Sequence, residues 1–316
     1  MKVTICVATI RPDTVGDAIA SIRRQSHEDW ELVVVGQGAE AAIRPAVQAA
    51  RDNDPRISYV HLDRKGLSIA RNHVLAVAAG DIVAFTDDDC EAPVDWLAEL
   101  VSAFTAAEIA LVFGSLVAPG PEHGRSRIRV CPQFMASDLI YDPVASNRHA
   151  PPGWGAVGAN FAVRREVAAR IGEFDEHLGA GARFAAAEET DYMLRAESLG
   201  VRMVSTPKVI ISHTHGYRYG WRAVYRHRRA YARGNGAVAA KHSLLQDDRG
   251  VSWLRHEVRT ATIEPIRTVK PHLLPVRLLR LAFFMSAYRT CMREYTTHSR
   301  FGPGDVVSAT LERRER

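Results

Sequence analysis

The amino-acid sequence predicts an α/β protein in which helices flank a mostly parallel sheet. Over roughly the first hundred residues, short apolar runs alternate with segments whose apolar residues repeat at helical spacing. The runs are almost uninterrupted, as in parallel strands that are covered on both faces. With 316 residues and 47% hydrophobic content, the chain can bury a large core in one or two domains.

Four strand–helix pairs can be placed in this part of the chain. The predicted strands are VTICVAT (3–9), WELVVVG (30–36), ISYVHL (57–62) and DIVAFTD (81–87). The predicted helices are residues 14–25, the alanine-rich segment that ends near Arg51, the segment that ends near Ala79, and the segment with Leu97, Leu100, Val101 and Phe104. Because ligands bind at the carboxyl ends of strands in such sheets, we expect a site where the fourth strand ends.

The later part of the chain is less regular. Residues 119–157 are rich in proline, glycine and histidine and predict no definite element. A glycine-rich loop, a short strand and a helix follow in 153–172, a second helix ends at Gly200, and one or two strands lie in 201–213.

These patterns predict the domain organisation. We expect one domain over residues 1–236, with halves at 1–118 and 119–236, and a basic, mostly helical C-terminal region over 237–316.

The net charge of +5 is unevenly distributed along the sequence. Between His213 and Gln246 there are six arginines and one lysine but no acidic residue. Four of the arginines share one helical stripe: Arg222, Arg226, Arg229 and Arg233. This segment is either a solvated helix face above an aromatic stripe that includes Trp221 and Tyr225 and packs in the core, or a surface for a diphosphate, a phosphorylated lipid or an anionic membrane.

Other segments bear on the cellular location. The apolar segment HLLPVRLLRLAFFMSAY (272–288) has no uncharged run longer than eight residues, Leu281 to Tyr288, so it is too short to span a bilayer. It can instead lie at a membrane interface, pack in the core or form a dimer contact. The N-terminus, MKVTICVATI, resembles a first strand and is too short for a secretion signal. The dispersed Cys6, Cys90, Cys131 and Cys291 predict reduced thiols in a cytoplasmic protein.

Three polar motifs are candidates for chemistry. Asp87, Asp88 and Asp89 end the fourth strand, where carboxylates suit Mg²⁺ or Mn²⁺ shared with phosphate oxygens, although a solvated turn has the same composition. EETD at 188–191 begins a helix, where acids are also favoured by the helix dipole. ISHTHG at 211–216 puts two histidines at a strand end, as metal ligands or as structural residues.

In this order and spacing, four segments resemble glycosyltransferase family 2, whose members are inverting nucleotide-sugar glycosyltransferases. They are VTICVATIRPDTVGDAIASIRRQ, GLSIARNHVLAVAAGDIVAFTDDDCEAPVDWLAEL, GWGAVGANFAVRREVAARIGEFDEHLG and EETDYMLRAESLGVRMVSTPKVIISH. The resemblance runs from Val3 to about Gly236 and implies the GT-A fold, a Rossmann-like, mostly parallel sheet flanked by helices. It implies nucleotide-sugar binding in the half 1–118, and acceptor binding and catalysis in the half 119–236.

The resemblance also implies roles for individual residues. The donor nucleotide sugar is expected to contact Thr9, Arg11, Gln37, Arg71, Asp87 and Asp88. The metal is expected on Asp89, Asp87 and His213, and the acceptor near Trp154, Gly158 and Asn160. Glu189 is the expected general base, flanked by Glu188 and Asp191, and its place near a helix start should keep it ionised.

This chain departs from the family pattern at two places. After the second strand the family usually has an aspartate that accepts a hydrogen bond from the base, whereas this chain has Gly36 and Gln37. Glutamine can accept through its carbonyl but also donates and has no charge, so the donor's base is open. The motif Glu-Glu-Thr-Asp replaces the commoner Glu-Asp, which leaves open which of its three acids is the base.

The implied reaction is metal-dependent transfer of a sugar, with inversion, from a nucleoside diphosphate sugar to a hydroxyl group of a glycan, a lipid-linked glycan or a small aglycone. Such an enzyme would serve cell-envelope polysaccharide synthesis, peripherally at the inner face of the plasma membrane, and a homodimer is compatible with the apolar C-terminal segment. No nucleic-acid-binding module is found in the sequence. Two alternatives are a nucleotidyltransferase that acts on sugar phosphates and a non-enzymatic carbohydrate- or anion-binding protein.

Overall fold

The computed structural model describes residues 1–105, 108–118, 127–129, 137–148, 150–151, 154–267 and 271–297. The chain forms two compact units. The first comprises Met1–Glu176 and Glu188–Gly220, and the second comprises His177–Ala187 and the described residues from Trp221 onward. Cys131 and much of the segment 119–157, for which no element was predicted, lie outside the described residues.

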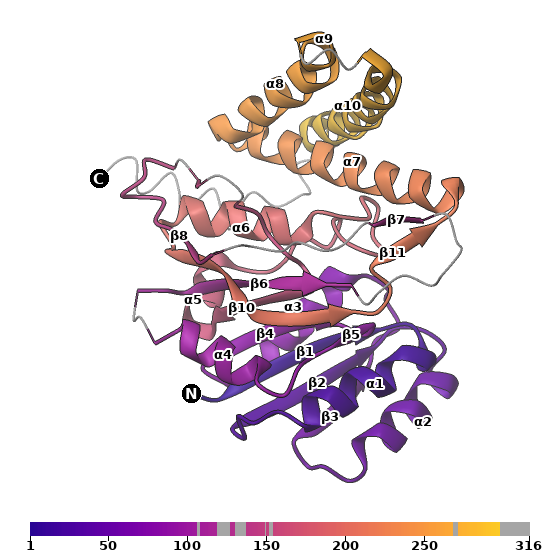
Figure 1. The fold of residues 1–316 in the computed structure, drawn as a ribbon, viewed down its shortest axis with the longest axis vertical. Coiled ribbons are helices and arrows are strands. Elements are labelled where there is room, and N and C mark those ends of the chain that lie inside the picture. The colour runs from indigo at the N-terminus through magenta and orange to yellow at the C-terminus, as the bar shows by residue number, and fades with distance from the viewer. Residues whose placement is uncertain are drawn as a thin grey trace. The chain divides into compact units, whose positions relative to one another are not determined.

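The first unit contains a sheet with the strand order β3-β2-β1-β4-β9-β6-β10-β5, in which β8 also pairs with β10 (Figure 1). Its first four strands are β1 (Val3–Thr9), β2 (Trp30–Gly36), β3 (Ile57–His61) and β4 (Ile82–Asp87). They are parallel, as predicted, because a helix between each strand and the next returns the chain to the same edge of the sheet. The apolar side chains of β1, β2 and β4 are almost completely buried, which confirms strands covered on both faces, whereas the edge strand β3 is only partly buried.

The second half of the sheet is mixed. β9 (Asn160–Arg164) runs antiparallel between β4 and β6 (Leu111–Val117), and β10 (Met203–His213) is parallel to β6. β5 (Cys90–Glu91) and β8 (Leu139–Tyr141) pair antiparallel with β10. A two-stranded sheet joins β7 (Arg127–Arg129) and β11 (Tyr217–Tyr219). The short β5 connects the end of β4 to the end of β10.

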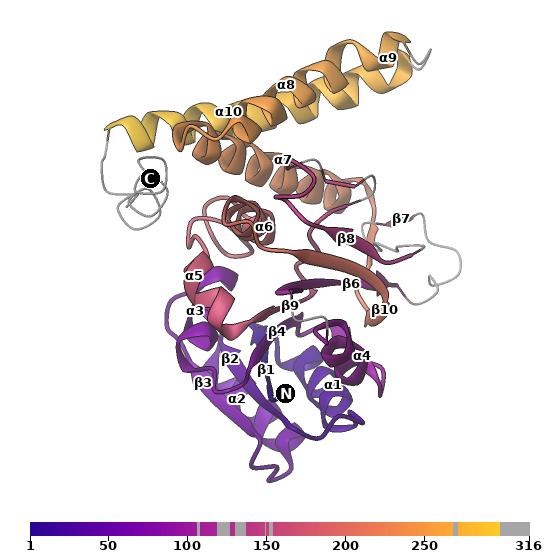
Figure 2. The same cartoon turned by 90° about the vertical axis from the view of Figure 1, so that its left-hand side faces the viewer.

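Helices cover both faces of this sheet. They are α1 (Pro12–Arg23), α2 (Glu40–Arg51), α3 (Leu67–Val77), α4 (Trp96–Ala103), α5 (Arg165–Ile171) and α6 (Glu188–Ser198). Figure 2 shows α1 and α4 on one side of the sheet and α3 and α5 on the other. Pro12 begins α1, where a missing N–H costs nothing. Gly200 follows α6 with φ of 71°, the left-handed conformation expected at a helix end.

The second unit is helical in its described part. Its helices are α7 (Trp221–Leu244), α8 (Asp248–Thr262), α9 (Glu264–Arg267) and α10 (Leu274–Thr297), with a 3₁₀ turn at Pro271–Leu273. The predicted boundary at residue 236 falls inside α7, because the basic segment and the alanine-rich segment form one continuous helix. A β-carbon at Gly236 would lie 2.2 Å from the carbonyl oxygen of Phe284, so α7 and α10 pack backbone against backbone.

The side chains of α7 and α10 refine the sequence predictions. Trp221 is 73% exposed and Tyr225 is 40% exposed, so the alternative in which they pack in the core does not hold. In α10, Phe284 and Ala287 are buried. None of the helices among the described residues combines the length and apolarity needed to cross a membrane.

Candidate functional site

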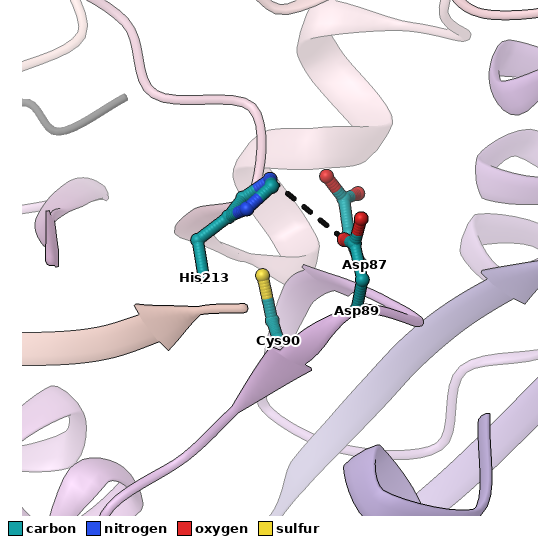
Figure 3. Close-up of side chains that lie close together, drawn as sticks. All are labelled: Asp87, Asp89, Cys90 and His213. Carbon is teal, nitrogen blue, oxygen red and sulfur yellow. Dashed lines mark ion pairs between the residues drawn. The ribbon is translucent and has the colours of Figure 1, made fainter. Parts of the chain in front are cut away.

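The candidate site lies where three strands of the first unit end. Asp87 is the last residue of β4, and Cys90 in β5 pairs with His213 at the end of β10. Ligand atoms of Asp87, Asp89, Cys90 and His213 all lie within 4.8 Å of one another. Figure 3 shows these side chains converging on one point, with the dashed line joining His213 and Asp89. The structure therefore brings together all three residues that were predicted to bind metal.

The charges of the three aspartates are compensated differently. Asp88 accepts a hydrogen bond from the hydroxyl of Thr9 at 2.6 Å and binds the guanidinium of Arg11. Asp89 lies 3.1 Å from Arg11 Nη2 and 3.7 Å from His213 Nε2. Asp88 is thus held by the last residue of β1 and by Arg11 in the loop that follows, whereas Asp87 and Asp89 face the cluster.

The donor set of this cluster fits a hard divalent ion. Burial raises the pKa of Asp87 to about 6; Arg71 opposes this shift, and the nearby charge of Asp89 adds to it. A cation would relieve this concentration of negative charge. His213 Nδ1 is buried and has no hydrogen-bond partner among the residues that the structure describes. Burial raises the pKa of Cys90 well above its usual value, so its sulfur stays a thiol and the oxygens and imidazole are the better ligands for Mg²⁺ or Mn²⁺.

Arg71 connects this cluster to the second acidic motif. Its side chain is 2% exposed and lies within 6 Å of three aromatic rings, those of Phe85, Phe161 and Phe174. Its guanidinium donates to Glu188 at 2.9 Å and to the carbonyl of Gly158 at 2.8 Å, and Nη2 lies 3.9 Å from Asp87. Two N–H groups of this buried side chain thus form an internal bridge to the second acidic motif, and its contact with the nucleotide stays a prediction.

Glu189 lies beside this bridge in the first turn of α6. A β-carbon at Gly158 would be 3.4 Å from Glu189 Cδ and 3.6 Å from Arg71 Nη2, so the missing side chain leaves room next to the carboxylate. Burial raises the pKa of Glu189 to about 8, Glu188 acts in the same direction, and Arg71 opposes both. The expectation that the helix start keeps Glu189 ionised is thus reversed, since burial and a like charge outweigh the dipole.

Two residues that were predicted to contact substrate have structural partners instead. Asp191 is completely buried and accepts a hydrogen bond from Arg195 at 3.0 Å. Asn160 is completely buried, donates to the carbonyls of Ser115 and Val209, and accepts from the indole of Trp96. Neither side chain is available to an acceptor, because a group that is buried and paired cannot reach a ligand without breaking the core.

Trp154 and Gly158, the other two predicted acceptor residues, lie in the loop before β9. Trp154 packs edge-on against Phe113 and Tyr141. Its indole N–H is buried and has no partner in the described part of the chain. Gly158 borders Glu189, as described above. These two positions remain compatible with an acceptor, in contrast to Asn160.

Gln37, the predicted reader of the nucleotide base, joins two loops of the protein. Its amide nitrogen donates to the carbonyls of Arg64 and Gly66, at 2.9 and 3.0 Å, and its oxygen accepts from the amide of Gly66. The side chain is 4% exposed. Because both ends of the amide are used, Gln37 fixes the segment that leads into α3 and Arg71.

The sequence left three features of the site unassigned. His215 Nδ1 lies 3.6 Å from Asp89 Oδ2, and only the spacing of the two histidines pointed to it. Cys90, for which only a reduced thiol was predicted, lies within the cluster. The pair of Arg71 and Glu188 joins residues 117 positions apart, and no local pattern could have revealed it.

A sheet that presents aspartates and a histidine at its strand ends, near Glu188 and Glu189, is the arrangement that the GT-A fold predicts. The chain belongs to the family described as "Glycosyl transferase family 2", and the family model matches residues 4–172. The predicted family and fold are thereby confirmed, and the chain is a glycosyltransferase.

Relatives with curated descriptions act in glycan synthesis. The chain is 25% identical over 222 residues to a glucosyl-dolichyl phosphate glucuronosyltransferase of Haloferax volcanii, which covers 67% of this chain and 69% of the relative. It is 26% identical over 257 residues to the succinoglycan biosynthesis protein ExoM of Rhizobium meliloti, with 78% of each chain covered.

Solved structures share the fold at lower identity. The mannosyltransferase PcManGT of Pyrobaculum calidifontis, solved with GDP-Man and Mn²⁺, aligns with a TM-score of 0.60 and 18% identity, over 92% of this chain and 87% of its own. S. aureus TarS in complex with UDP-GlcNAc aligns with a TM-score of 0.55 and 15% identity, over 94% of this chain and 92% of its own. At these identities the likeness shows the fold alone.

Proposed function

We propose that this glycosyltransferase moves a sugar, with inversion, from a nucleoside diphosphate sugar to an acceptor hydroxyl and that it requires a divalent metal ion. The observation that carries the proposal is the bridge of Arg71, which lies 3.9 Å from Asp87 and binds Glu188 beside Glu189. One buried cation thus stands between a metal-type cluster and a carboxyl with a raised pKa. A transferase of this class needs both groups, one for the leaving diphosphate and one for the acceptor.

Asp87, Asp89 and His213 would hold the metal, which would supply a Lewis acid for the charge that develops on the leaving diphosphate. The chain contributes a further charge nearby, because the guanidinium of Arg11 is 42% exposed and borders Asp89. A guanidinium in this place suits a phosphate oxygen of the donor. Arg11 therefore keeps its proposed place beside the donor, whereas Thr9 is buried and its hydroxyl is hydrogen-bonded to Asp88 and to the backbone of Arg11.

Glu189 would take the proton of the acceptor hydroxyl as the hydroxyl attacks the sugar. The raised pKa makes its carboxylate a stronger base than an exposed glutamate once it is ionised. Glu188 is committed to Arg71 and Asp191 to Arg195, so Glu189 is the acid of this motif that is not held in an ion pair with an arginine in the described structure.

The class of donor and acceptor is supported by the relatives. The solved proteins are described with GDP-Man or UDP-GlcNAc, and one curated relative is named a glucosyl-dolichyl phosphate glucuronosyltransferase. We infer that the donor is a nucleoside diphosphate sugar and that the acceptor is a glycan, either free or linked to a lipid.

The N-terminal half of α7 supports a peripheral location at an anionic membrane. Exposed aromatic and basic side chains alternate there: Trp221, Arg222, Tyr225, Arg226, Arg228, Arg229 and Tyr231. Arginines attract anionic head groups and tryptophan and tyrosine insert at their level, which together favour an anionic lipid surface. A homodimer stays a prediction.

A panel of nucleotide sugars tests the proposed reaction. The purified protein should hydrolyse one nucleoside diphosphate sugar slowly with Mn²⁺ or Mg²⁺ and stop in excess chelator, and the same nucleotide should raise its melting temperature. Turnover that is unaffected by chelator would refute the metal requirement, and protection by no nucleotide in the panel would refute the donor class.

A further inference from the structure

The loop after β1 supplies a cation to the aspartates. The guanidinium of Arg11 binds Asp88 through Nε and Nη2, and the same Nη2 lies 3.1 Å from Asp89 Oδ2. One side chain therefore bridges two consecutive carboxylates. Asp88 and Asp89 are 4% and 9% exposed, so without this bridge their charges would repel each other with little help from solvent.

The backbone fixes the position of Arg11. β1 and β4 are adjacent in the sheet, with Ala8 opposite Asp87, so the loop that follows β1 runs beside the aspartates. Arg11 immediately precedes Pro12, the first residue of α1, and its amide donates to the hydroxyl of Thr9 at 3.0 Å. The same hydroxyl lies 2.6 Å from Asp88. The arginine and its anchor on Asp88 are therefore built into the turn.

Asp89 lies between Arg11 and the rest of the cluster that would hold the metal ion. Its Oδ2 faces Arg11, and its Oδ1 faces His213, which belongs to the metal-type cluster. We propose that Arg11 is the internal counter-cation of Asp88 and Asp89, that it competes with the divalent ion for Asp89, and that it thereby sets the metal affinity of the protein before the donor binds. This inference rests on the proposed metal dependence.

The size of the effect follows from charge and exposure. A divalent ion on Asp89 would be repelled by a guanidinium a few ångströms away, and solvent weakens this repulsion because Arg11 is 42% exposed. Removing the charge should therefore tighten metal binding about tenfold. A role of Arg11 in folding alone would lower stability but would not raise the affinity for a metal.

The test measures Mn²⁺ binding to the full chain without donor, by electron paramagnetic resonance of the free ion. Arg11→Gln should bind Mn²⁺ about tenfold more tightly than the wild type. In chelator the melting temperature of Arg11→Gln should lie about 5 °C below that of the wild type, because two buried carboxylates lose their partner. Adding Mn²⁺ should raise the melting temperature of Arg11→Gln by more than it raises that of the wild type. Arg11→Lys keeps the charge and should bind Mn²⁺ nearly as the wild type does.

Arg44→Gln is the matched control. Arg44 forms an ion pair with Glu40 on α2 and is 47% exposed, so the substitution removes the same charge at a similar exposure. It should leave the Mn²⁺ affinity unchanged.

Each other outcome contradicts the inference in a distinguishable way. Equal or weaker Mn²⁺ binding by Arg11→Gln, with a wild type that does bind, overturns the role of Arg11 and leaves the proposed metal dependence intact. Absence of Mn²⁺ binding in the wild type and in both Arg11 variants overturns the metal dependence together with this inference. If Arg11→Gln fails to fold, Arg11→Lys still tests the inference. Because it keeps the charge, Mn²⁺ binding by Arg11→Lys that is tenfold tighter than that of the wild type would contradict the role of Arg11.

Discussion

Replacing Glu188 with glutamine should shift the pH dependence of the enzyme without removing its base. Glu188 is the neighbour whose negative charge helps to raise the pKa of Glu189 to about 8, and Arg71 acts in the opposite direction. In Glu188→Gln the like charge is lost, and Arg71 loses the carboxylate to which it donates at 2.9 Å. Both changes favour the ionised form of Glu189.

The magnitude follows from the charges. Glu188 lies within hydrogen-bond reach of Glu189. Two like charges about 4 Å apart, at an effective dielectric constant of about 20, interact by about 4 kcal/mol, an upper limit equivalent to about three pH units. Because Glu189 is not fully enclosed, we expect about one unit. The ascending limb of kcat/KM, which reports the base in the free enzyme, should lie near pH 8 in the wild type and near pH 7 in Glu188→Gln.

Glu189→Gln is the companion variant. It should lower kcat by about 10²- to 10⁴-fold at every pH, because an amide cannot take the acceptor's proton, while the affinity for the nucleotide stays the same. Its stability gives a second readout. The folded wild type holds a proton on Glu189 up to about pH 8 that the unfolded chain loses near 4.5, so wild-type stability falls as the pH rises between these values, and Glu189→Gln should lose less.

The assay measures the initial rate of sugar release from about pH 5.5 to about pH 9.5. Melting curves are recorded in the same buffers. An ascending limb that stays in place in Glu188→Gln would refute the electrostatic coupling of the two glutamates. Near-normal kcat in Glu189→Gln would refute its role as the base.

Three further predictions concern other parts of the chain. Asp89→Asn should cut metal-dependent turnover by about 10²-fold or more with the fold intact by circular dichroism, and wild-type activity would contradict its role as a ligand. Gln37→Ala should lower the melting temperature and the affinity for all nucleotides alike, because its amide holds the backbone at Gly66; a changed preference between bases would show instead that it reads the base. The wild type should bind anionic vesicles at low salt and release them at high salt, Trp221→Ser and Arg226→Glu should each weaken binding, and equal binding by all three would contradict the α7 surface.

Much of the fold and the location of the site could be predicted from the sequence alone. Strands β1 to β4 were located by their apolar runs, since burial on both faces leaves a continuous pattern. The aspartates at the end of β4 and the acids at the start of α6 could be found because each motif is local, and the carboxyl ends of parallel strands meet at one edge. His213 was found by the same reasoning at the end of β10.

The roles within the site were decided by tertiary contacts. Arg71 and Asn160 look like polar residues that are available to a substrate, yet both are buried and donate hydrogen bonds to segments far away in the sequence. The raised pKa of Glu189 depends on its burial and on its neighbours, which a helix position does not specify. A motif fixes which groups are present, but whether a group meets substrate or protein depends on which distant backbone and side-chain atoms surround it, because a buried polar group must find its partners wherever the fold brings them.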